Sequence, residues 1–346
     1  MNVMMMDTNQ KIDDKDNNNN NERIKQLRTL VQLAVEECTP CDAILLSGGV
    51  DTSVLAETIK HCNLTPLKTA ITVVCSNEAR DGHYATEIAK RCQLEHHLLN
   101  TTLDDLLANH LEFAIKTLRT FDPMELRNSI VISMALRKAQ ELGCRTVMTG
   151  DAADELFAGY TFMHNYSEEK LAEYSQRLTR IMRFSSRILA AAMGMEIRQP
   201  YLDDRVIAFA KECTKSEKIN IHDGTRHGKF ILRQAFEDVA YSAWRLKEPI
   251  ECGSGSTVMP AHLAAKLTTE ELDKEKERVW LEDKIKIRDA EHLHYYRVFR
   301  KLFPVDDSNG YPSLVRFGDD PCPACSYQMT SREQNFCVIC GHYPAR

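Results

Sequence analysis

The chain has 346 residues, of which 43% are hydrophobic and 27% are charged, and its formal net charge is −6. These values are typical of a globular protein with one large domain and a small additional module, and they exclude a chain-wide electrostatic field for nucleic acid. No apolar run approaches the roughly 18 residues of a membrane span, so we expect no membrane partner.

The first residues have a low-complexity composition. Residues 1–22 are rich in Asn and Asp, which predicts a disordered tail, and they lack the apolar stretch and cleavage site of a signal peptide. Scattered cysteines without a signal peptide favour a reducing, cytoplasmic location. Apolar residues at helical spacing then predict a helix over residues 23–37, which opens a main domain predicted to span residues 23–305.

A loop with two glycines follows the first predicted strand. The apolar run 43–46 predicts a buried strand, and residues 54–59 predict a helix. Two glycines at such a turn let backbone amides converge on an anion, and the helix start adds unpaired donors. The residues that we expect to bind phosphate are Ser47, Gly48, Gly49, Asp51, Thr52 and Ser53. The alternative is an ordinary strand-turn-helix corner, and the absence of a following Lys excludes a Walker P-loop.

Strands and helices alternate through the first half of the chain, and the second half is predicted to be helical. Further strands are predicted over residues 68–75, 96–99 and 144–149. Helices are predicted over residues 81–92, 102–118, 126–142, 167–193, 204–213, 226–240 and 290–303. The alternation predicts an α/β fold with a doubly wound parallel sheet, in which ligands bind at the carboxyl ends of the strands.

Three acidic residues follow the strand predicted over residues 144–149. Asp151, Asp154 and Glu155 lie within five positions of one another. Acids beside a polyphosphate would repel it unless a cation such as Mg²⁺ lay between them. The alternative is an acidic first turn of a helix, which the helix dipole favours.

These segments resemble the motifs of the PP-loop ATP pyrophosphatases, and in particular those of the synthetase domain of asparagine synthetases and β-lactam synthetases. Residues 47–53 resemble SGGxD[ST][ST], and residues 149–160 resemble SGEGADELFGGY. Residues 196–203 resemble E-x-R-x-PFLD, and residues 229–236 resemble K-x-ILR-x-A-F. Residues 244–255 resemble R-x-K-E followed by G-x-G, so five motifs occur in the order of the family.

The resemblance implies how ATP and a metal ion would be held. Residues 47–53 would bind the pyrophosphate of ATP, with Val74 and Gly150 beside the nucleotide. Asp51 and Asp154 would hold Mg²⁺, and Asp154 would thereby contribute to catalysis.

The resemblance also implies catalytic roles for two further residues. Lys247 would stabilise negative charge in the transition state. Asp151 stands where the family has Glu, near the activated carboxylate and the incoming amine, and its shorter side chain could accompany a substrate other than aspartate. Other motif residues have structural alternatives, since Arg198 and Asp203 could form an ion pair and Lys229 could be a solvated helix residue.

The activity implied by the resemblance is that of an ATP-dependent amide-forming ligase. Such an enzyme activates a carboxylate as acyl-AMP with release of pyrophosphate, and an amine or ammonia then attacks. The loop begins at Ser47, so we expect no glutaminase domain before it, and ammonia would be free or come from a separate amidotransferase subunit. A degenerate ATP-binding scaffold is the non-enzymatic alternative, which the intact loop and Lys247 disfavour.

Four cysteines near the end of the chain have the spacing of a zinc site. Cys322, Cys325, Cys337 and Cys340 form a CxxC-x11-CxxC pattern, which predicts a Zn²⁺-binding ribbon over residues 318–346. So short a segment cannot build its own core, so the metal would supply much of its folding energy. Residues 38–41 form a lone CxxC, for which a capped turn is favoured over redox chemistry.

A basic stretch before the predicted ribbon leads to a second functional hypothesis. Residues 284–288 and 295–301 interleave aromatic and basic side chains, a pattern found on surfaces that bind RNA. The alternative function is therefore adenylation of tRNA or another RNA, with the ribbon as the recognition module. A helix with one apolar and one basic face would also explain this stretch.

Overall fold

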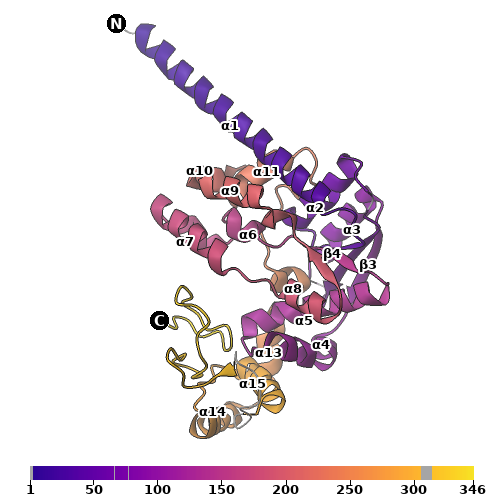
Figure 1. Cartoon of the computed structure of the whole chain (residues 1–346), viewed down its shortest axis with the longest axis vertical. Coiled ribbons are helices and arrows are strands. Elements are labelled where there is room, and N and C mark those ends of the chain that lie inside the picture. The colour runs from indigo at the N-terminus through magenta and orange to yellow at the C-terminus, as the bar shows by residue number, and fades with distance from the viewer. Residues whose placement is uncertain (1–2, 66, 77, 305–313) are drawn as a thin grey trace.

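A parallel five-stranded sheet lies at the centre of the computed structural model, which describes residues 3–65, 67–76, 78–304 and 314–346 (Figure 1). The strands are β1 (Ala43–Leu45), β2 (Thr69–Val74), β3 (Glu95–Asn100), β4 (Thr146–Met148) and β5 (Glu196–Arg198). They pair in parallel in the order β3-β2-β1-β4-β5. The predicted doubly wound parallel sheet is confirmed, and β5 is a strand that the sequence pattern did not predict.

The strand order places two sequence motifs at the same edge of the sheet. The chain adds β2 and β3 on one side of β1 and then crosses to add β4 on the other side. Ile44 of β1 therefore pairs with Ala70 of β2 and with Met148 of β4. Doubly wound sheets bind ligands where the strand order reverses in this way. The loops that follow β1 and β4 flank this point.

Helices cover both faces of the sheet because successive strand residues point to opposite faces. Ile44, Ala70 and Met148 belong to one core, whose helices include α1 (Val3–Glu37), α2 (Val50–His61), α3 (Asp81–Cys92), α9 (Asp204–Glu212) and α11 (Phe230–Phe236). Ala43, Ile71 and Val147 belong to the other core, whose helices include α4 (Leu103–Leu118), α5 (Pro123–Glu141), α8 (Ser185–Ala192), α13 (Met259–Ala264) and α15 (Ala290–Leu302).

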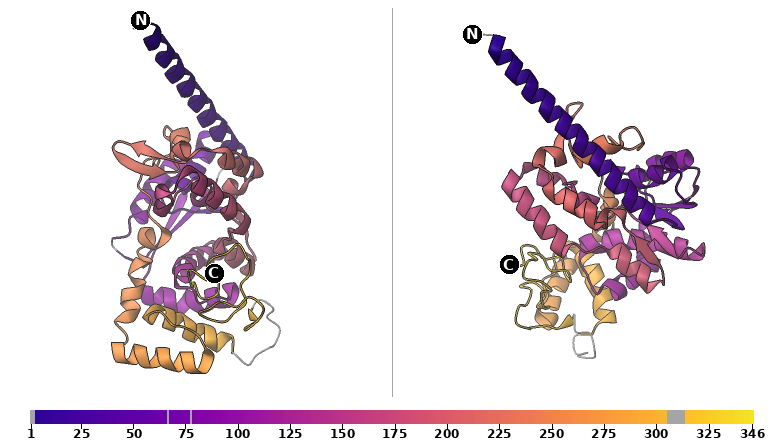
Figure 2. Two further views of the ribbon diagram at one scale, coloured as in Figure 1. Left: turned by 90° about the vertical axis from the view of Figure 1, so that its left-hand side faces the viewer. Right: turned by 45° about the horizontal axis from the view of Figure 1, so that its top comes forward.

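Helix α1 extends further toward the N-terminus than the sequence predicts. Its second half packs on the domain through the buried residues Leu27, Val31 and Val35. We expected disorder over residues 1–22, but the structure continues the helix back to Val3, and this part projects away from the domain (Figures 1 and 2). Once a helix is nucleated, each further residue adds one hydrogen bond for the conformational entropy of ordering a single residue. This cooperativity accounts for the extension.

The second half of the chain is mainly helical, with one antiparallel hairpin formed by β6 (Ile219–His222) and β7 (Thr225–Gly228). The predicted helix over residues 226–240 is therefore wrong at its start. A Cβ at Gly228 would lie 2.1 Å from the carbonyl oxygen of Ala158, so the backbones meet closely here. The remaining helices are α6 (Ala153–Leu156), α7 (Glu168–Ile181), α10 (Lys215–Lys218), α12 (Ile250–Ser254) and α14 (Thr269–Asp283), with short 3-10 turns at Thr161–Asn165, Pro200–Leu202 and Ser256–Val258.

The C-terminal segment is compact and packs against the domain near α5 and α15 (Figures 1 and 2). Two isolated β-bridges, Arg316 with Tyr327 and Pro321 with Gln328, hold its first part together. The predicted domain boundary at residue 305 lies outside the described residues. No helix in the described parts of the chain is long and apolar enough to cross a membrane.

Candidate active site

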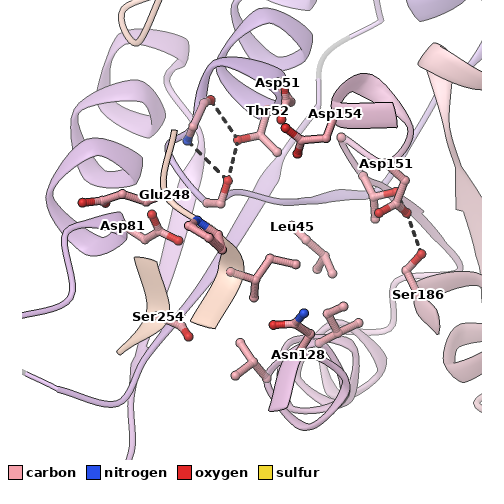
Figure 3. A pocket seen from close by; sticks show the side chains of 18 of the residues that line it. Leu45, Asp51, Thr52, Asp81, Asn128, Asp151, Asp154, Ser186, Glu248 and Ser254 are labelled. Carbon is pink, nitrogen blue, oxygen red and sulfur yellow. Dashed lines mark hydrogen bonds between the residues drawn. The ribbon is translucent and has the colours of Figure 1, made fainter. Parts of the chain in front are cut away.

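A cavity of about 590 Å³ opens at the carboxyl ends of β1, β2 and β4. Figure 3 shows side chains around it, and four parts of the chain supply most of its lining. These are the loop after β1, the loop after β4, one face of α5, and the segment 245–254. The cavity lies at the reversal of the strand order, so the fold and the two sequence motifs indicate the same site.

The loop after β1 is held in a conformation that requires its first glycine. Gly48 has a φ of +74°, and a Cβ there would lie 2.6 Å from the Cβ of Tyr84. The Oγ atom of Ser47 lies 3.3 Å from the backbone nitrogen of Gly49 and 3.3 Å from Oγ1 of Thr52. Ser47, Gly49 and Thr52 all line the cavity, at the start of α2. The loop therefore presents hydroxyl and backbone donors where an anion would be stabilised.

Two residues predicted to contact ATP have other neighbours in the structure. Ser53 is fully buried, and its hydroxyl donates to Oε2 of Glu57 at 2.6 Å and accepts from the backbone nitrogen of Ser242 at 3.2 Å. Val74 is buried, and its carbonyl accepts from the backbone nitrogen of Thr101 at 3.0 Å. The two residues before Val74 line the cavity instead. This geometry supports a structural role for Ser53 and Val74.

The carboxylates of Asp51 and Asp154 converge on one buried ammonium group, that of Lys229. Its Nζ donates to Oδ1 and Oδ2 of Asp51 at 2.8 and 2.6 Å and lies 2.6 Å from Oδ1 of Asp154. Nζ of Lys247 donates to Oδ2 of Asp154, also at 2.6 Å. A Cβ at Gly159 would lie 1.8 Å from Oδ1 of Asp154, so only glycine leaves room for this arrangement. Figure 3 shows Asp51 and Asp154 side by side at the edge of the cavity.

The lysines keep the Asp154 carboxylate charged in spite of its burial. Burial alone would raise the pKa of Asp154, but the ammonium groups of Lys229 and Lys247 outweigh it and lower the pKa to about 2. Burial also opposes the charged form of Lys247, but the nearby carboxylates of Asp154 and Asp51 raise its pKa. Asp154 and Lys247 therefore stabilise each other in their charged forms.

Lys229 is the functional candidate that the sequence left ambiguous. Its side chain is only 1% exposed, so it is not a solvated helix residue. The residue has a φ of +57° immediately before α11, and this conformation directs the chain from β7 into the helix. Its place at the head of the K-x-ILR-x-A-F segment was the one signal in the sequence that could have identified it.

The carboxylate of Asp151 is oriented by three donors. Oδ2 accepts hydrogen bonds from Oγ1 of Thr149 at 2.6 Å, Oγ of Ser186 at 2.6 Å and Nε2 of Gln199 at 2.9 Å. Figure 3 shows Asp151 turned toward Ser186 and separated from Asp51 and Asp154. Among the described residues these three donors all bond to one oxygen, which leaves the other carboxylate oxygen as an acceptor for a ligand. The neighbouring residue, Gly150, also lines the cavity. A Cβ at this position would lie only 2.9 Å from the Cβ of Asp51, so a larger residue would collide with Asp51.

Two further acids line the cavity, namely Glu155, which belongs to the predicted acidic segment, and Asp81, to which no role was assigned from the sequence. Glu155 accepts a hydrogen bond from the hydroxyl of Tyr160 at 2.6 Å, and burial raises the pKa of Glu155 to about 7. Burial also raises the pKa of Asp81 to about 6, although Arg245 opposes the rise from 2.8 Å away. Nη1 of Arg245 also donates to the carbonyl of Ser47 at 3.2 Å, which ties the later R-x-K-E segment to the loop after β1.

Other sequence hypotheses are resolved by direct contacts. The proposed ion pair between Arg198 and Asp203 does not form, because Arg198 lies 3.0 Å from Glu196 and Asp203 lies 2.7 Å from Arg205. In the CxxC of residues 38–41, burial raises the pKa of the Cys41 thiol to about 11, which disfavours the reactive thiolate.

One wall of the cavity is apolar. Leu45 and Val73 contribute from the sheet, and Val131 and Ile132 contribute from α5. Within this wall, Oδ1 of Asn128 is buried and has no hydrogen-bond partner among the described residues. Figure 3 shows the carboxamide of Asn128 directed from α5 into the cavity, below Leu45. A flat ligand with polar edges would fill the apolar space and satisfy this amide.

The four C-terminal cysteines form a cluster with the dimensions of a metal site. Their sulfur atoms all lie within 4.8 Å of one another, and all four residues are buried. The Sγ atoms of Cys322 and Cys340 are 3.7 Å apart, as are those of Cys325 and Cys337. A Zn–S bond of about 2.3 Å places the sulfurs of a tetrahedron about 3.8 Å apart. The residues therefore fit Zn²⁺.

The chain was compared with known proteins. The family model described as asparagine synthase matches residues 26–188 and 178–311. A probable glutamine-hydrolyzing asparagine synthetase of Dictyostelium discoideum is 30% identical over 239 residues, covering 61% of this chain and 42% of that protein. A glutamine-hydrolyzing asparagine synthetase of Zea mays is 26% identical over 304 residues, covering 82% of this chain and 50% of that protein. This chain thus spans about half the length of the curated relatives that it matches.

Among solved structures, an NMN synthetase from Francisella tularensis matches with 16% sequence identity and a TM-score of 0.29. The match covers 59% of this chain and 99% of that protein. So slight a likeness has no bearing on the site.

Proposed function

The chain belongs to the asparagine synthase family, and on this premise we propose that it is an ATP-dependent amide-forming ligase that activates a carboxylate as acyl-AMP. The observation that carries the proposal is the convergence of Asp51 and Asp154 beside the loop after β1. Two carboxylates that meet on one cation, next to hydroxyl and backbone donors, have the chemistry needed to hold a polyphosphate with its metal ion.

We assign the two ends of ATP to the two kinds of wall in the cavity. Adenine fits the apolar wall of Leu45, Val73 and α5, where Oδ1 of Asn128, unpartnered among the described residues, would accept a hydrogen bond from its amino group. The phosphates then lie along the loop after β1, next to Asp51. This arrangement leaves the α-phosphate near Gly150 and Asp151 of the loop after β4.

In the proposed reaction, a carboxylate oxygen of the substrate bonds to the α-phosphorus of ATP. The bond from that phosphorus to the oxygen bridging the β-phosphate breaks, and pyrophosphate leaves with the electron pair. An amine nitrogen then bonds to the activated carbonyl carbon, loses a proton, and displaces AMP. Aspartate is the carboxylate that the family suggests, and it is the first substrate to test.

The charged groups of this chain match the charge that develops in both steps. Asp154 holds the ammonium group of Lys247 at the site. Lys247 would there stabilise the negative charge that develops on the phosphates. Asp151 would orient the amine, because its second carboxylate oxygen can accept a hydrogen bond from an N–H group. Asp51 and Asp154 would hold Mg²⁺, which when bound would neutralise charge on the phosphate oxygens.

The nitrogen donor is part of the same proposal. The curated relatives are named as glutamine-hydrolyzing enzymes, and this chain covers about half of their length. We propose that this domain takes ammonia, supplied either free or by an amidotransferase. A direct comparison of ammonia with glutamine as the nitrogen source would distinguish the two routes.

The alternative function, adenylation of RNA, has weaker support from the described residues. Three arginines of the predicted RNA-binding stretch have partners within the chain. Arg297 lies 3.0 Å from Glu275, and Arg300 lies 3.3 Å from Asp283. Arg288 donates to the carbonyl of Gly341 at 3.0 Å. The stretch therefore serves packing within the chain, and RNA stays the second candidate substrate.

The experiment that tests the proposal is trapping of the activated carboxylate. The protein is incubated with ATP, Mg²⁺, hydroxylamine and a panel of carboxylates that begins with aspartate. We expect a hydroxamate of one carboxylate, formed with an equal amount of pyrophosphate, and none with the Asp51→Asn variant. Pyrophosphate formation that depends on RNA but on none of the small carboxylates would favour the alternative function.

A further inference from the structure

The cysteine ribbon contacts the domain at the start of the helix that forms one wall of the cavity. The second CxxC segment, Cys337–Cys340, faces residues 120–122, the turn that leads from α4 into α5. The Oγ1 of Thr120 donates to the carbonyls of Val338 and Ile339 at 2.8 and 3.0 Å. The backbone nitrogen of Phe121 donates to the carbonyl of Ile339 at 2.7 Å. These bonds attach the turn to the metal-binding segment itself.

The residue that caps α5 is held by the same segment. The side chain of Asp122 accepts from the backbone nitrogen of Met124 at 3.1 Å and so caps the helix. A Cβ at Gly341, which has a φ of +70°, would lie 2.1 Å from Oδ1 of Asp122. Only glycine leaves the capping carboxylate in place. Arg288 completes the contact, because it donates to the carbonyl of Gly341 at 3.0 Å.

Thr120 joins the ribbon to the cap from the other side. Its Oγ1 also accepts from the backbone nitrogen of Asp122 at 3.0 Å, so one buried hydroxyl connects the ribbon carbonyls with the capping residue. Phe121 is buried against Tyr296 and Phe299 of α15, with ring centroids 5.2 and 4.9 Å apart. The turn is therefore fixed by the ribbon and by α15, and cannot shift independently of them.

The first three turns of α5 face the cavity. Met124, Asn128 and Val131 all line it, and Oδ1 of Asn128 has no hydrogen-bond partner within the described part of the chain. The residues matched by the family model end at 311, before the first of the four cysteines. The ribbon thus lies outside the region that matches the family model, whereas the helix α5 that it contacts lies within that region.

From these contacts we infer that the metal-binding ribbon positions the start of α5 and thereby forms the adenosine-binding wall of the cavity. The inference rests on the proposed function, which places adenine against this wall. A bound Zn²⁺ would hold Cys337 and Cys340 at fixed separation, and the carbonyls between them would then hold Thr120 and Phe121. The ribbon is in this account a positioning element for ATP.

The test separates the adenosine part of the site from the phosphate part. Thr120→Val removes the hydroxyl that links the ribbon to the turn, and Thr120→Ser keeps it. Phe336→Ala is the matched control, because Phe336 lies on the ribbon and is 39% exposed. For each protein we would measure bound zinc, calorimetric affinity for AMP and for inorganic pyrophosphate with Mg²⁺, and hydrogen exchange of residues 123–131.

We expect Thr120→Val to retain its zinc, to bind AMP about tenfold more weakly and to exchange faster over residues 123–131, since a lost buried hydrogen bond has an effect of this size. Its affinity for pyrophosphate should be unchanged, and Thr120→Ser and Phe336→Ala should match the wild type. Removal of zinc from the wild type should reproduce the faster exchange.

The inference is overturned if Thr120→Val keeps both the exchange rate and the AMP affinity of the wild type. It is also overturned if both ligands are lost to the same degree, because that result indicates general destabilisation. A wild-type protein that binds neither AMP nor pyrophosphate would instead refute the proposed function. In that case the exchange of residues 123–131, with and without zinc, still decides whether the ribbon positions α5.

Discussion

The ammonium group of Lys229 and the carboxylate of Asp51 form an ion pair with a distance of 2.6 Å from Nζ to Oδ2, and the lysine side chain is 1% exposed. Asp154 contacts the same ammonium from the other side, at 2.6 Å. The two acids that would hold Mg²⁺ are therefore already paired with an internal cation. A metal ion held by Asp51 and Asp154 would share their carboxylates with Lys229 or displace its ammonium group.

A first prediction concerns the removal of this internal cation. Lys229→Met leaves two neighbouring carboxylates, each 15% exposed, without their shared partner, and we expect it to lower the free energy of unfolding by about 3 kcal/mol. Because Mg²⁺ can replace the lost charge, adding Mg²⁺ should stabilise the variant more than the wild type. Urea unfolding with and without Mg²⁺ measures both effects.

The control for this prediction is Lys266→Met. Lys266 is 47% exposed and pairs with the exposed Asp104, so its ion pair should contribute little to stability. A Lys229→Met protein that is as stable as this control, or that does not respond to Mg²⁺, would show that Asp51 and Asp154 do not depend on a shared cation.

A second prediction separates two serines that the sequence motif treats alike. Ser47 lines the cavity, whereas the hydroxyl of Ser53 is buried between Glu57 and Ser242. We expect Ser47→Ala to weaken the binding of pyrophosphate with little change in stability. Ser53→Ala should lower the free energy of unfolding by about 1–3 kcal/mol, because it leaves buried polar groups unpaired.

Calorimetric titration with pyrophosphate and urea unfolding of both variants provide the comparison. If Ser53→Ala were fully stable and lost pyrophosphate binding, the hydroxyl of Ser53 would be a ligand, as the motif alone suggests.

The motifs predicted residues that the structure brings together around one cavity, but they could not give the orientation of each side chain. Ser47, Gly48 and Asp51 were predictable because a strand, a glycine pair and a helix start are recognisable from local pattern. The inward direction of Ser53 depends on Glu57 and on a segment almost 200 positions away, so no local pattern reveals it. The same holds for a buried Lys, whose partners come from distant parts of the chain.

The fold was predictable to a similar depth. Alternating strands and helices identified the parallel sheet, because each element carries its own periodicity. The pattern did not reveal β5, because a strand of three residues with two charged side chains, Glu196–Arg198, is too short to show an alternation of apolar and polar residues. It also missed the hairpin before Lys229, where close approach of Gly228 to Ala158 overrides helical spacing. Such contacts join segments that are distant in the sequence, so a local sequence pattern cannot predict them.

A third prediction follows from Glu155. Burial raises the pKa of Glu155 to about 7 in the folded protein, whereas an unfolded Glu titrates near 4.5. Between these values the folded state binds more protons than the unfolded state, so this group makes stability fall as the pH rises from about 4.5 to about 7. Below and above this range its contribution is constant.

Glu155→Gln removes this titration, so the difference in unfolding free energy between wild type and variant should change by up to about 3 kcal/mol across that range. The difference is the relevant quantity, because Glu291 also has a raised pKa of about 7 and is present in both proteins. A difference that is flat from pH 4.5 to 7 would show that Glu155 titrates normally.

A fourth prediction concerns the ribbon metal. We expect the purified protein to contain one zinc ion per chain, and Cys325→Ala to contain none, because three thiolates hold structural zinc far less tightly than four. Elemental analysis by mass spectrometry measures the content. Cys62→Ala is the control, since Cys62 lies at the end of α2 and away from the cluster. Stoichiometric zinc in Cys325→Ala would contradict a four-cysteine site.

The central claim is that the site around Asp51 and Asp154 cuts ATP between its α and β phosphates. The most direct measurement is ³¹P NMR of the products formed from ATP and Mg²⁺ with the carboxylate that hydroxylamine trapping identifies. We predict AMP and pyrophosphate in equal amounts, and no product with Asp51→Asn. Formation of ADP and inorganic phosphate by the wild type would contradict the account.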